Sequence, residues 1–177
     1  TVSVTQASNP SVLTNGDFVS GTTGWKTFNV DNVDIVKQVV DGQFRWYRPG
    51  SGAGVVFQET GRAITAFTPV QASFRVGNIG NTDGRRRRFS VLIHDQNFSD
   101  LSVCTFTMEP NAPMALYRMA THATADWTGA GHGITISIYA ADTGATGGYY
   151  QLDDVVLQVD NVTGNSDAET ICTDPTA

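Results

Sequence analysis

Short segments in which apolar and polar side chains alternate recur along the whole chain, and they constrain the fold more than any other feature. In GITISIYA, residues 133–140, the three isoleucines would share one face of a strand and the residues between them the other. No window longer than about ten residues repeats apolar residues at the spacing of a helix. The sequence therefore predicts an all-β protein.

Other segments are also rich in β-branched and aromatic residues and are bounded by turn residues. They are residues 33–40, 42–48, 53–60, 70–78, 89–95, 101–108, 115–121 and 149–159. About ten short strands at this spacing favour an antiparallel two-sheet jelly-roll β-sandwich. At 177 residues we expect one such domain, residues 11–159. An N-terminal extension strand (1–10) would precede it, and a polar C-terminal tail (160–177) would follow.

The charge balance excludes some classes of partner. Eleven basic residues face seventeen acidic ones, for a net charge of −6, which argues against a nucleic-acid partner. No apolar run approaches the roughly 20 residues of a membrane helix, so no membrane insertion is expected. The arginines at 85–88 stand out against this acidic background. They are either a solvated loop end or a contact for an acidic glycan or an acidic neighbouring subunit.

The two cysteines, Cys104 and Cys172, lack the spacing of metal ligands. An even number of cysteines in a chain rich in Ser, Thr and Gly predicts a disulfide and an oxidising compartment. Because Cys172 lies in the polar tail, the bridge would attach that tail to the strand at 101–108. The chain opens with TVSVTQAS, as expected of a mature secreted or cell-surface protein.

The residues that catalysis needs do not form a recognisable set. Glycoside hydrolysis requires two carboxylates about 5 to 10 Å apart. The chain has few glutamates, and Asp153 and Asp154, as neighbours on a strand, would point to opposite faces. The histidines lack a metal-binding spacing and are expected at the surface or at strand ends: His94, His122 and His132. We therefore predict that the protein is not an enzyme.

Two segments resemble the ends of a known type of domain. LTNGDFVSGTTGW, residues 13–25, and YYQLDDVVLQV, residues 149–159, are similar to the opening N-G-x-F-E-x-G…G-W and closing hDDVxL segments of certain carbohydrate-binding modules. These are modules with a galactose-binding-like jelly roll, of families four, nine and twenty-two. The resemblance implies a two-sheet jelly roll with a sugar-binding surface on its concave face or its loops. It also implies a structural calcium near the two segments.

Within the opening segment, Asn15 and Gly16 form a turn dipeptide and Phe18 is a candidate core anchor. The glycines at 21 and 24 would allow Trp25 to fold back onto the core. We expect this segment to be structural.

Calcium ligands are predicted from the same two segments. Val19 stands where the family pattern has Glu, so Asp17 would have to substitute for that carboxylate. Strand alternation places Asp153 on the face of Val155 and Leu157, the expected core side. A carboxylate buried there needs a cation or several hydrogen-bond donors, and calcium prefers oxygen ligands. The predicted calcium ligands are Asp17, Asp153 and Asp154, with a hydrogen-bonded structural aspartate as the alternative.

The segment QFRWYR, residues 43–48, combines aromatic and polar groups, as a sugar site requires. Phe44 and Trp46 share the more apolar face, so Arg45 and Tyr47 are the predicted exposed ligand contacts, followed by Trp46. Additional candidates, without a distinguishing feature, are His94, Tyr117, Arg118 and Trp127. The alternative is that all of these are ordinary sandwich residues.

Two functions are compatible with these features. The first is a non-catalytic extracellular module that binds a glycan or polysaccharide, or acts in adhesion. The second is a structural subunit that polymerises with copies of itself into a filament or surface layer. Residues 1–8 carry a strand pattern, with Val2 and Val4 on one face, and an extended segment of this kind can complete a neighbour's sheet edge.

Overall fold

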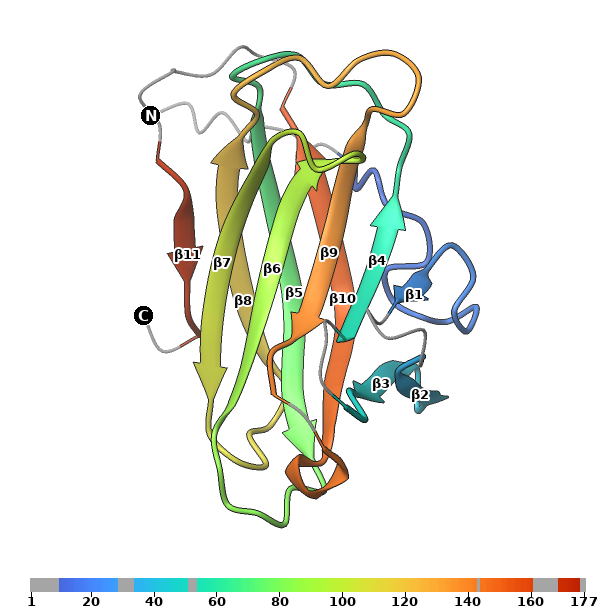
Figure 1. Ribbon diagram of the computed structural model, residues 1–177, viewed down its shortest axis with the longest axis vertical. Helices are drawn as coiled ribbons and strands as arrows, with labels where there is room; N and C mark the ends of the chain where they lie inside the picture. Colours follow the sequence, from blue (N-terminus) through green and yellow to red (C-terminus); the bar gives the residue numbers. More distant parts are fainter. Residues whose placement is uncertain (1–9, 29–33, 51–53, 143, 161–168, 176–177) are drawn as a thin grey trace, which may run out of the picture.

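A computed structural model describes residues 10–28, 34–50, 54–142, 144–160 and 169–175, and every structural statement below concerns these residues. They form two antiparallel sheets packed face to face, which confirms the predicted jelly-roll sandwich (Figure 1). No α-helix occurs among them; a 3₁₀ turn lies at Ala145–Gly147. None of the described segments forms a helix long and apolar enough to cross a membrane. The predicted strand at residues 1–8 lies outside the described residues.

The five-stranded sheet, called sheet A, lies in front in Figure 1. Its order is β1 (Lys26–Phe28), β4 (Gly54–Glu59), β9 (Ile134–Ala140), β6 (Arg87–Asp95) and β7 (Leu101–Met108).

The six-stranded sheet, called sheet B, has the order β11 (Ile171–Thr173), β8 (Ala115–His122), β5 (Pro69–Ile79), β10 (Tyr149–Val159), β3 (Gln43–Tyr47) and β2 (Val36–Val40). Each segment predicted as a strand between residues 33 and 159 overlaps one of these strands, and β5, β6 and β8 extend one or two residues beyond the predicted bounds. β1 and β11 were not predicted, because three residues are too few to show an alternation.

The core contains the inward-facing side chains of both sheets. A row of aromatic rings runs through it in the order Trp25, Phe18, Phe44, Trp46 and Tyr150, with successive centroids 5.2 to 5.5 Å apart. Such spacing adds favourable ring interactions to the burial of apolar area. Trp46 is 0% exposed. The prediction that Trp46 is a ligand contact is therefore wrong, because its ring is part of the core.

The opening segment is a structural corner, as predicted. Asn15 ties the turn together, because its Nδ2 donates to the carbonyls of Gly21 and Thr23, both at 3.0 Å. Its own carbonyl accepts a 2.9 Å hydrogen bond from Nε1 of Trp25. A Cβ on Gly16 would lie 2.1 Å from the carbonyl oxygen of Val155, so only glycine allows this close approach.

A β-bulge in β10 corrects the predicted orientation of Asp153. The register with β5 shifts between Asp153 and Val156, and Asp154 takes a left-handed φ of 49°. The bulge changes the phase of the alternation, so both Leu152 and Val155 are buried in the core. Asp153, which follows Leu152 and pairs with the exposed Arg75, therefore faces outward on sheet B.

The predicted disulfide between Cys104 and Cys172 is present, with the two Cα atoms 5.7 Å apart. It joins β7, one of the two edge strands of sheet A, to β11, one of the two edge strands of sheet B, and Figure 1 shows β11 beside β7. β11 forms only three register pairs with β8. The disulfide therefore fixes a short strand that would be weakly held by its ladder alone.

We predict that replacing both cysteines by serine lowers the free energy of unfolding by about 4 kcal/mol, because closing a loop of this size restricts the unfolded chain. Urea unfolding of the double variant and of the oxidised protein would measure the difference. The oxidised protein with added reductant should match the variant. Equal midpoints for variant and oxidised protein would contradict the prediction.

Candidate functional site

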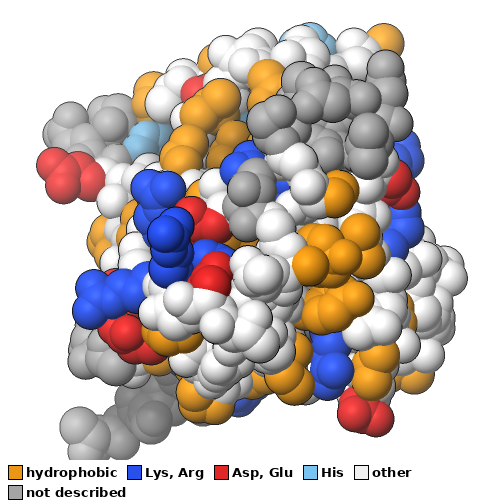
Figure 2. All heavy atoms as spheres, turned by 60° about the horizontal axis from the view of Figure 1, so that its bottom comes forward, with side chains coloured by type: hydrophobic (Ala, Val, Ile, Leu, Met, Phe, Trp, Pro, Cys, Tyr) orange, Lys and Arg blue, Asp and Glu red, His pale blue; other side chains and the backbone are white. Residues whose placement is uncertain are grey.

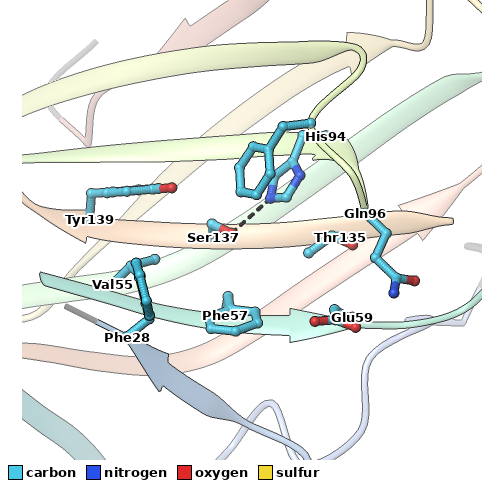
Figure 3. Close-up of a pocket in the computed structure, with 10 residues that line it drawn as sticks. Phe28, Val55, Phe57, Glu59, His94, Gln96, Thr135, Ser137 and Tyr139 are labelled. Atoms are coloured by element: carbon cyan, nitrogen blue, oxygen red, sulfur yellow. Dashed lines mark hydrogen bonds between the residues drawn. The ribbon is translucent and has the colours of Figure 1, made fainter. Parts of the chain in front are cut away.

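The outer face of sheet A carries a cavity of about 240 Å³. Strand register places three rows of side chains across this face. Glu59, Thr135 and His94 form one row; Phe57, Ser137 and Leu92 form the next; Val55, Tyr139 and Ser90 form the third. Figure 3 shows the cavity, which is lined by Phe28, Val55, Phe57, Glu59, His94, Gln96, Phe98, Thr135, Ser137 and Tyr139.

Aromatic side chains form the sides of the cavity. Phe28 from β1 and Phe98 from the β6–β7 loop are 51% and 50% exposed, although large apolar residues usually bury more. Phe57 and Tyr139 come from neighbouring strands, β4 and β9, and point outward from sheet A. The cavity therefore offers rings from four separate parts of the chain.

The loop that carries Phe98 is fixed from below by Asp95, whose carboxylate is fully buried. That carboxylate accepts hydrogen bonds from Ser99 Oγ at 2.8 Å and from the backbone NH of Gly133 at 2.9 Å, and it also contacts His132. Burial would raise the pKa of Asp95, but these hydrogen bonds outweigh it and hold the pKa below its ordinary value. The position of Phe98 is thus set before any ligand arrives.

His94 forms part of the cavity floor and is 1% exposed. Its Nδ1 lies 2.6 Å from the carbonyl oxygen of Asp95, which can only accept, so Nδ1 is the donor. Nε2 then accepts from the hydroxyl of Ser137 at 2.8 Å. Burial lowers the pKa of His94, which agrees with a neutral ring. Phe98 stacks on this ring with centroids 4.0 Å apart.

Glu59 is the carboxylate among the residues that line the cavity, and Lys26 lies 3.6 Å from it. Glycoside hydrolysis needs a second carboxylate across the bond. The lining residues do not supply one. The cavity can therefore contact and orient a ligand through rings, hydroxyls, an amide and the carboxylate of Glu59, which is the one carboxylate among its described lining residues.

Arg45 and Tyr47, the predicted ligand contacts, lie on the other side of the molecule. Their strand, β3, belongs to sheet B, and both side chains point away from the core. Gln43 accepts from Gln151 at 3.0 Å and from Arg45 at 3.4 Å, and Tyr47 packs edge-on against Tyr149. The structure thus brings Arg45 and Tyr47 together, but not with the cavity of sheet A. Whether they contact a ligand stays a prediction.

The additional candidates divide between core and surface. Tyr117 and Trp127 are buried, at 5% and 1% exposure, so they are core residues and not ligand contacts. Trp127 Nε1 donates to the carboxylate of Asp100 at 3.0 Å. His94 lines the cavity described above, and Arg118 is exposed on sheet B.

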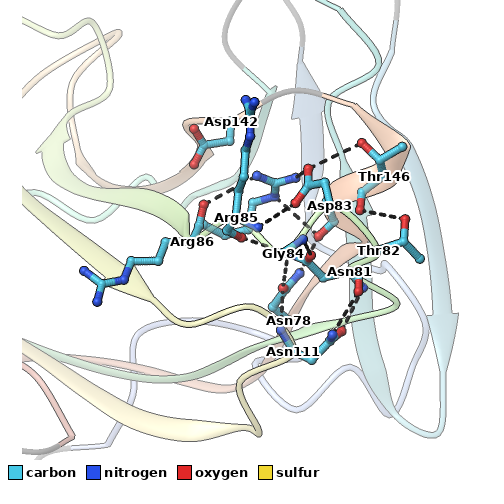
Figure 4. Close-up of polar contacts among 12 residues, drawn as sticks. Asn78, Asn81, Thr82, Asp83, Gly84, Arg85, Arg86, Asn111, Asp142 and Thr146 are labelled. Carbon is cyan, nitrogen blue, oxygen red and sulfur yellow. Dashed lines mark hydrogen bonds and ion pairs between the residues drawn. The ribbon is translucent and has the colours of Figure 1, made fainter.

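The arginines at 85–88 lie at the end of the sandwich that carries the β5–β6 loop, where Figure 2 shows basic and acidic side chains intermixed. Arg86 lies 2.9 Å from Glu109, and Arg88 lies 3.5 Å from Asp142. Arg87 is buried and paired with Asp83, and Figure 4 shows Asp83 within a network of polar contacts. Local carboxylates thus offset most of the positive charge, which favours a solvated loop end over a contact for an acidic partner.

The predicted calcium ligands Asp17, Asp153 and Asp154 lie near enough to one another for their charges to interact. Burial, and then the charges of Asp154 and Asp17, raise the pKa of Asp153. Asp154 lies 3.4 Å from Arg75, and Asp153 accepts a hydrogen bond from the backbone NH of Asp154. Among the described residues no group of three or more His, Cys, Asp or Glu side chains is placed to hold a metal ion. Calcium binding stays a prediction.

No protein-family model matches the sequence, and no curated protein is similar to it. Solved structures nevertheless share the fold. CBM4, a family 4 carbohydrate-binding module, is 17% identical with a TM-score of 0.57, over 81% of this chain and 99% of that chain. The CBM22-2 xylan-binding domain from Paenibacillus barcinonensis is 12% identical with a TM-score of 0.56, over 82% of this chain and 98% of that chain.

A further similar structure is the arabinose-bound MgGH51 α-L-arabinofuranosidase, at 13% identity and a TM-score of 0.63. That match covers 86% of this chain but 27% of the other, so only one part of the larger protein is similar to this chain. At sequence identities this low, the similarity shows a shared fold alone. The resemblance of residues 13–25 and 149–159 to carbohydrate-binding modules is confirmed at that level.

The cavity residues that sequence reasoning missed carry only weak signals. Phe57 and Tyr139 alternate with buried residues in β4 and β9, so each could be assigned to an outer face. The sequence does not reveal that β4 and β9 are neighbours, because they are separated by more than seventy residues and several strands. Phe98 has no periodic context at all.

We predict that Asp153→Asn raises the melting temperature at neutral pH in the presence of chelator. The raised pKa of Asp153 means that the folded state favours the protonated carboxyl over the carboxylate. The folded protein therefore loses stability as pH rises through this pKa. Asparagine, which stays neutral, avoids that loss. The difference from the unsubstituted protein should vanish as pH falls below the ordinary value of 3.8.

Calcium provides the second arm of this experiment. If Asp17, Asp153 and Asp154 bind the ion, millimolar calcium should raise the melting temperature of the unsubstituted protein but not that of Asp153→Asn. Identical responses of both proteins to calcium would contradict a calcium site at Asp153.

Proposed function

We propose that this chain is a non-catalytic carbohydrate-binding module and that the cavity on the outer face of sheet A is its glycan-binding site. The observation that carries the proposal is the exposure of Phe28 and Phe98 on opposite sides of a cavity that also contains Phe57 and Tyr139. Exposed rings gathered at one hollow indicate a binding surface, whereas singly scattered apolar residues would not.

The chemistry of the cavity suits a sugar. The C–H faces of a pyranose pack on aromatic rings, while its hydroxyls need donors and acceptors nearby. The Tyr139 hydroxyl, the Gln96 amide and the Glu59 carboxylate supply both kinds of group at the rim. His94 and Ser137 satisfy each other in the floor, so no buried polar group there is left unpaired when the cavity is filled.

The proposed module binds without hydrolysing its ligand, since Glu59 has no second carboxylate beside it in the cavity lining. Fold likeness supports this interpretation as analogy, since carbohydrate-binding modules, including a xylan-binding domain, are among the similar structures. An extracellular module of this type would attach its protein, or the cell that carries it, to a polysaccharide.

The alternative of self-assembly depends on residues 1–8, which lie outside the described residues. It stays a prediction that deletion of residues 1–8 would abolish a polymer while leaving a folded subunit. None of the described contacts favours it over glycan binding.

Tyr139→Ala tests the proposed site, with Tyr47→Ala as the matched control on sheet B. We expect Tyr139→Ala to weaken binding to xylo-, cello- or galacto-oligosaccharides about tenfold, because a ring contact and its buried area are lost. Tyr47→Ala should bind like the unsubstituted protein. Isothermal titration with ligands selected on a glycan array would measure both.

The opposite result, loss with Tyr47→Ala and not with Tyr139→Ala, would move the site to the residues predicted from the sequence. A glycan array without any binder above background would overturn glycan binding altogether.

A further inference from the structure

A second hollow, of about 430 Å³, lies on the outer face of sheet B, on the opposite side of the sandwich from the glycan cavity. Strand register explains its shape. Ser73 pairs with Arg118, which pairs with Thr173, and Gln71 pairs with Gln158 and Ala120 in the neighbouring row. The short side chains of Ser73 and Ala120 leave a depression between the longer Gln71, Gln158 and Arg118.

The hollow is electropositive in an otherwise acidic protein. Among the described residues that line it, the charged one is Arg118, which is exposed and forms no hydrogen bond or ion pair with any described residue. By contrast, Arg75, Arg86 and Arg88 each lie within 3.5 Å of a carboxylate. Asp174 directly follows β11 in the chain. Burial of Tyr117 is the first cause of its raised pKa, and the charge of Asp174 is the second. The guanidinium of Arg118 is thus available to an external anion.

We propose that this hollow binds the carboxylate of a uronic-acid residue in an acidic glycan. A guanidinium matches a carboxylate with two parallel hydrogen bonds, and arginine is the side chain best suited to that geometry. The amide of Gln71 and the hydroxyls of Ser73 and Thr173 both donate and accept, as sugar hydroxyls require. None of the described residues that line the hollow carries a carboxylate that would repel the ligand.

The backbone beneath the hollow favours a glycan over a peptide carboxylate. An extended peptide is usually bound by adding a strand to a free sheet edge. β5 is already paired with both β8 and β10, and β8 with both β5 and β11. The floor therefore has no free ladder for a peptide backbone, whereas side-chain amides and hydroxyls are at hand for a sugar ring.

The disulfide maintains one wall of this site. Thr173 belongs to β11, which is attached to the sandwich by Cys104–Cys172 and by a short pairing with β8. Release of β11 would remove the Thr173 hydroxyl and open the hollow on that side. Binding of the acidic glycan is therefore expected to be weaker in the reduced protein, although Arg118 stays on β8.

Trigalacturonate is the probe, and its neutral counterpart, galactotriose, is the reference ligand. We expect Arg118→Gln to weaken trigalacturonate binding at least about tenfold, since a charge-assisted pair is lost. Binding should also weaken as salt rises. Arg85→Gln, a change at another exposed arginine, should leave the affinity unchanged. In NMR spectra the backbone amides of Ser73, Ala120 and Thr173 should shift on addition of trigalacturonate.

The outcomes separate this site from the glycan cavity of sheet A. Tyr139→Ala should leave trigalacturonate binding intact, and Arg118→Gln should leave neutral-glycan binding intact.

The proposal is overturned if Arg118→Gln, with an unchanged melting temperature, binds trigalacturonate like the unsubstituted protein, or if galactotriose produces the same shifts. Displacement by millimolar acetate would show that any carboxylate suffices and would overturn the assignment to a uronic acid. Gln71→Ala, expected to weaken binding to a smaller extent, provides a check independent of Arg118.

Discussion

The burial of one face of each sheet against the other is the constraint on which the remaining structure depends. The aromatic row from Trp25 to Tyr150 fills the space between the sheets, and the isoleucines of β9 pack into the same core. Since successive side chains of a strand point to opposite faces, the residues next to a buried residue point outward. The side chains that can reach a ligand therefore lie on the two outer faces, in the loops and at the edges.

The two outer faces carry different chemistry. On sheet A, rings from Phe28, Phe57 and Tyr139 surround a cavity whose charged lining group is Glu59. On sheet B, polar side chains surround Arg118 in a hollow whose described lining residues include no acidic one. A neutral sugar suits the first surface and an acidic one the second. Under the two proposals made above, one small domain contacts two types of glycan from opposite sides.

The edges of the sandwich are protected by short strands and a covalent link. β1 and β11 each have three residues, and β11 lies beside β7, a longer edge strand that contains no charged residue. Natural sheets cover or shorten their edges to prevent strand addition by other chains. The Cys104–Cys172 disulfide holds β11 beside β7, and Thr173 of β11 lines the hollow on sheet B.

The sequence by itself determined the sandwich, the strands between residues 33 and 159, the corner at Asn15 and Trp25, and the disulfide, because alternation, turn residues and cysteine number are local signals. Only the tertiary structure decided which strands are neighbours, and therefore that Tyr139 lines one cavity with Phe57 and His94 while Tyr47 lies on the other sheet. It also decided the orientation of Asp153, because a single bulge reverses the alternation in a way that no local pattern reveals. Binding surfaces arise from register between strands distant in sequence, and register is set by the packing of the whole core.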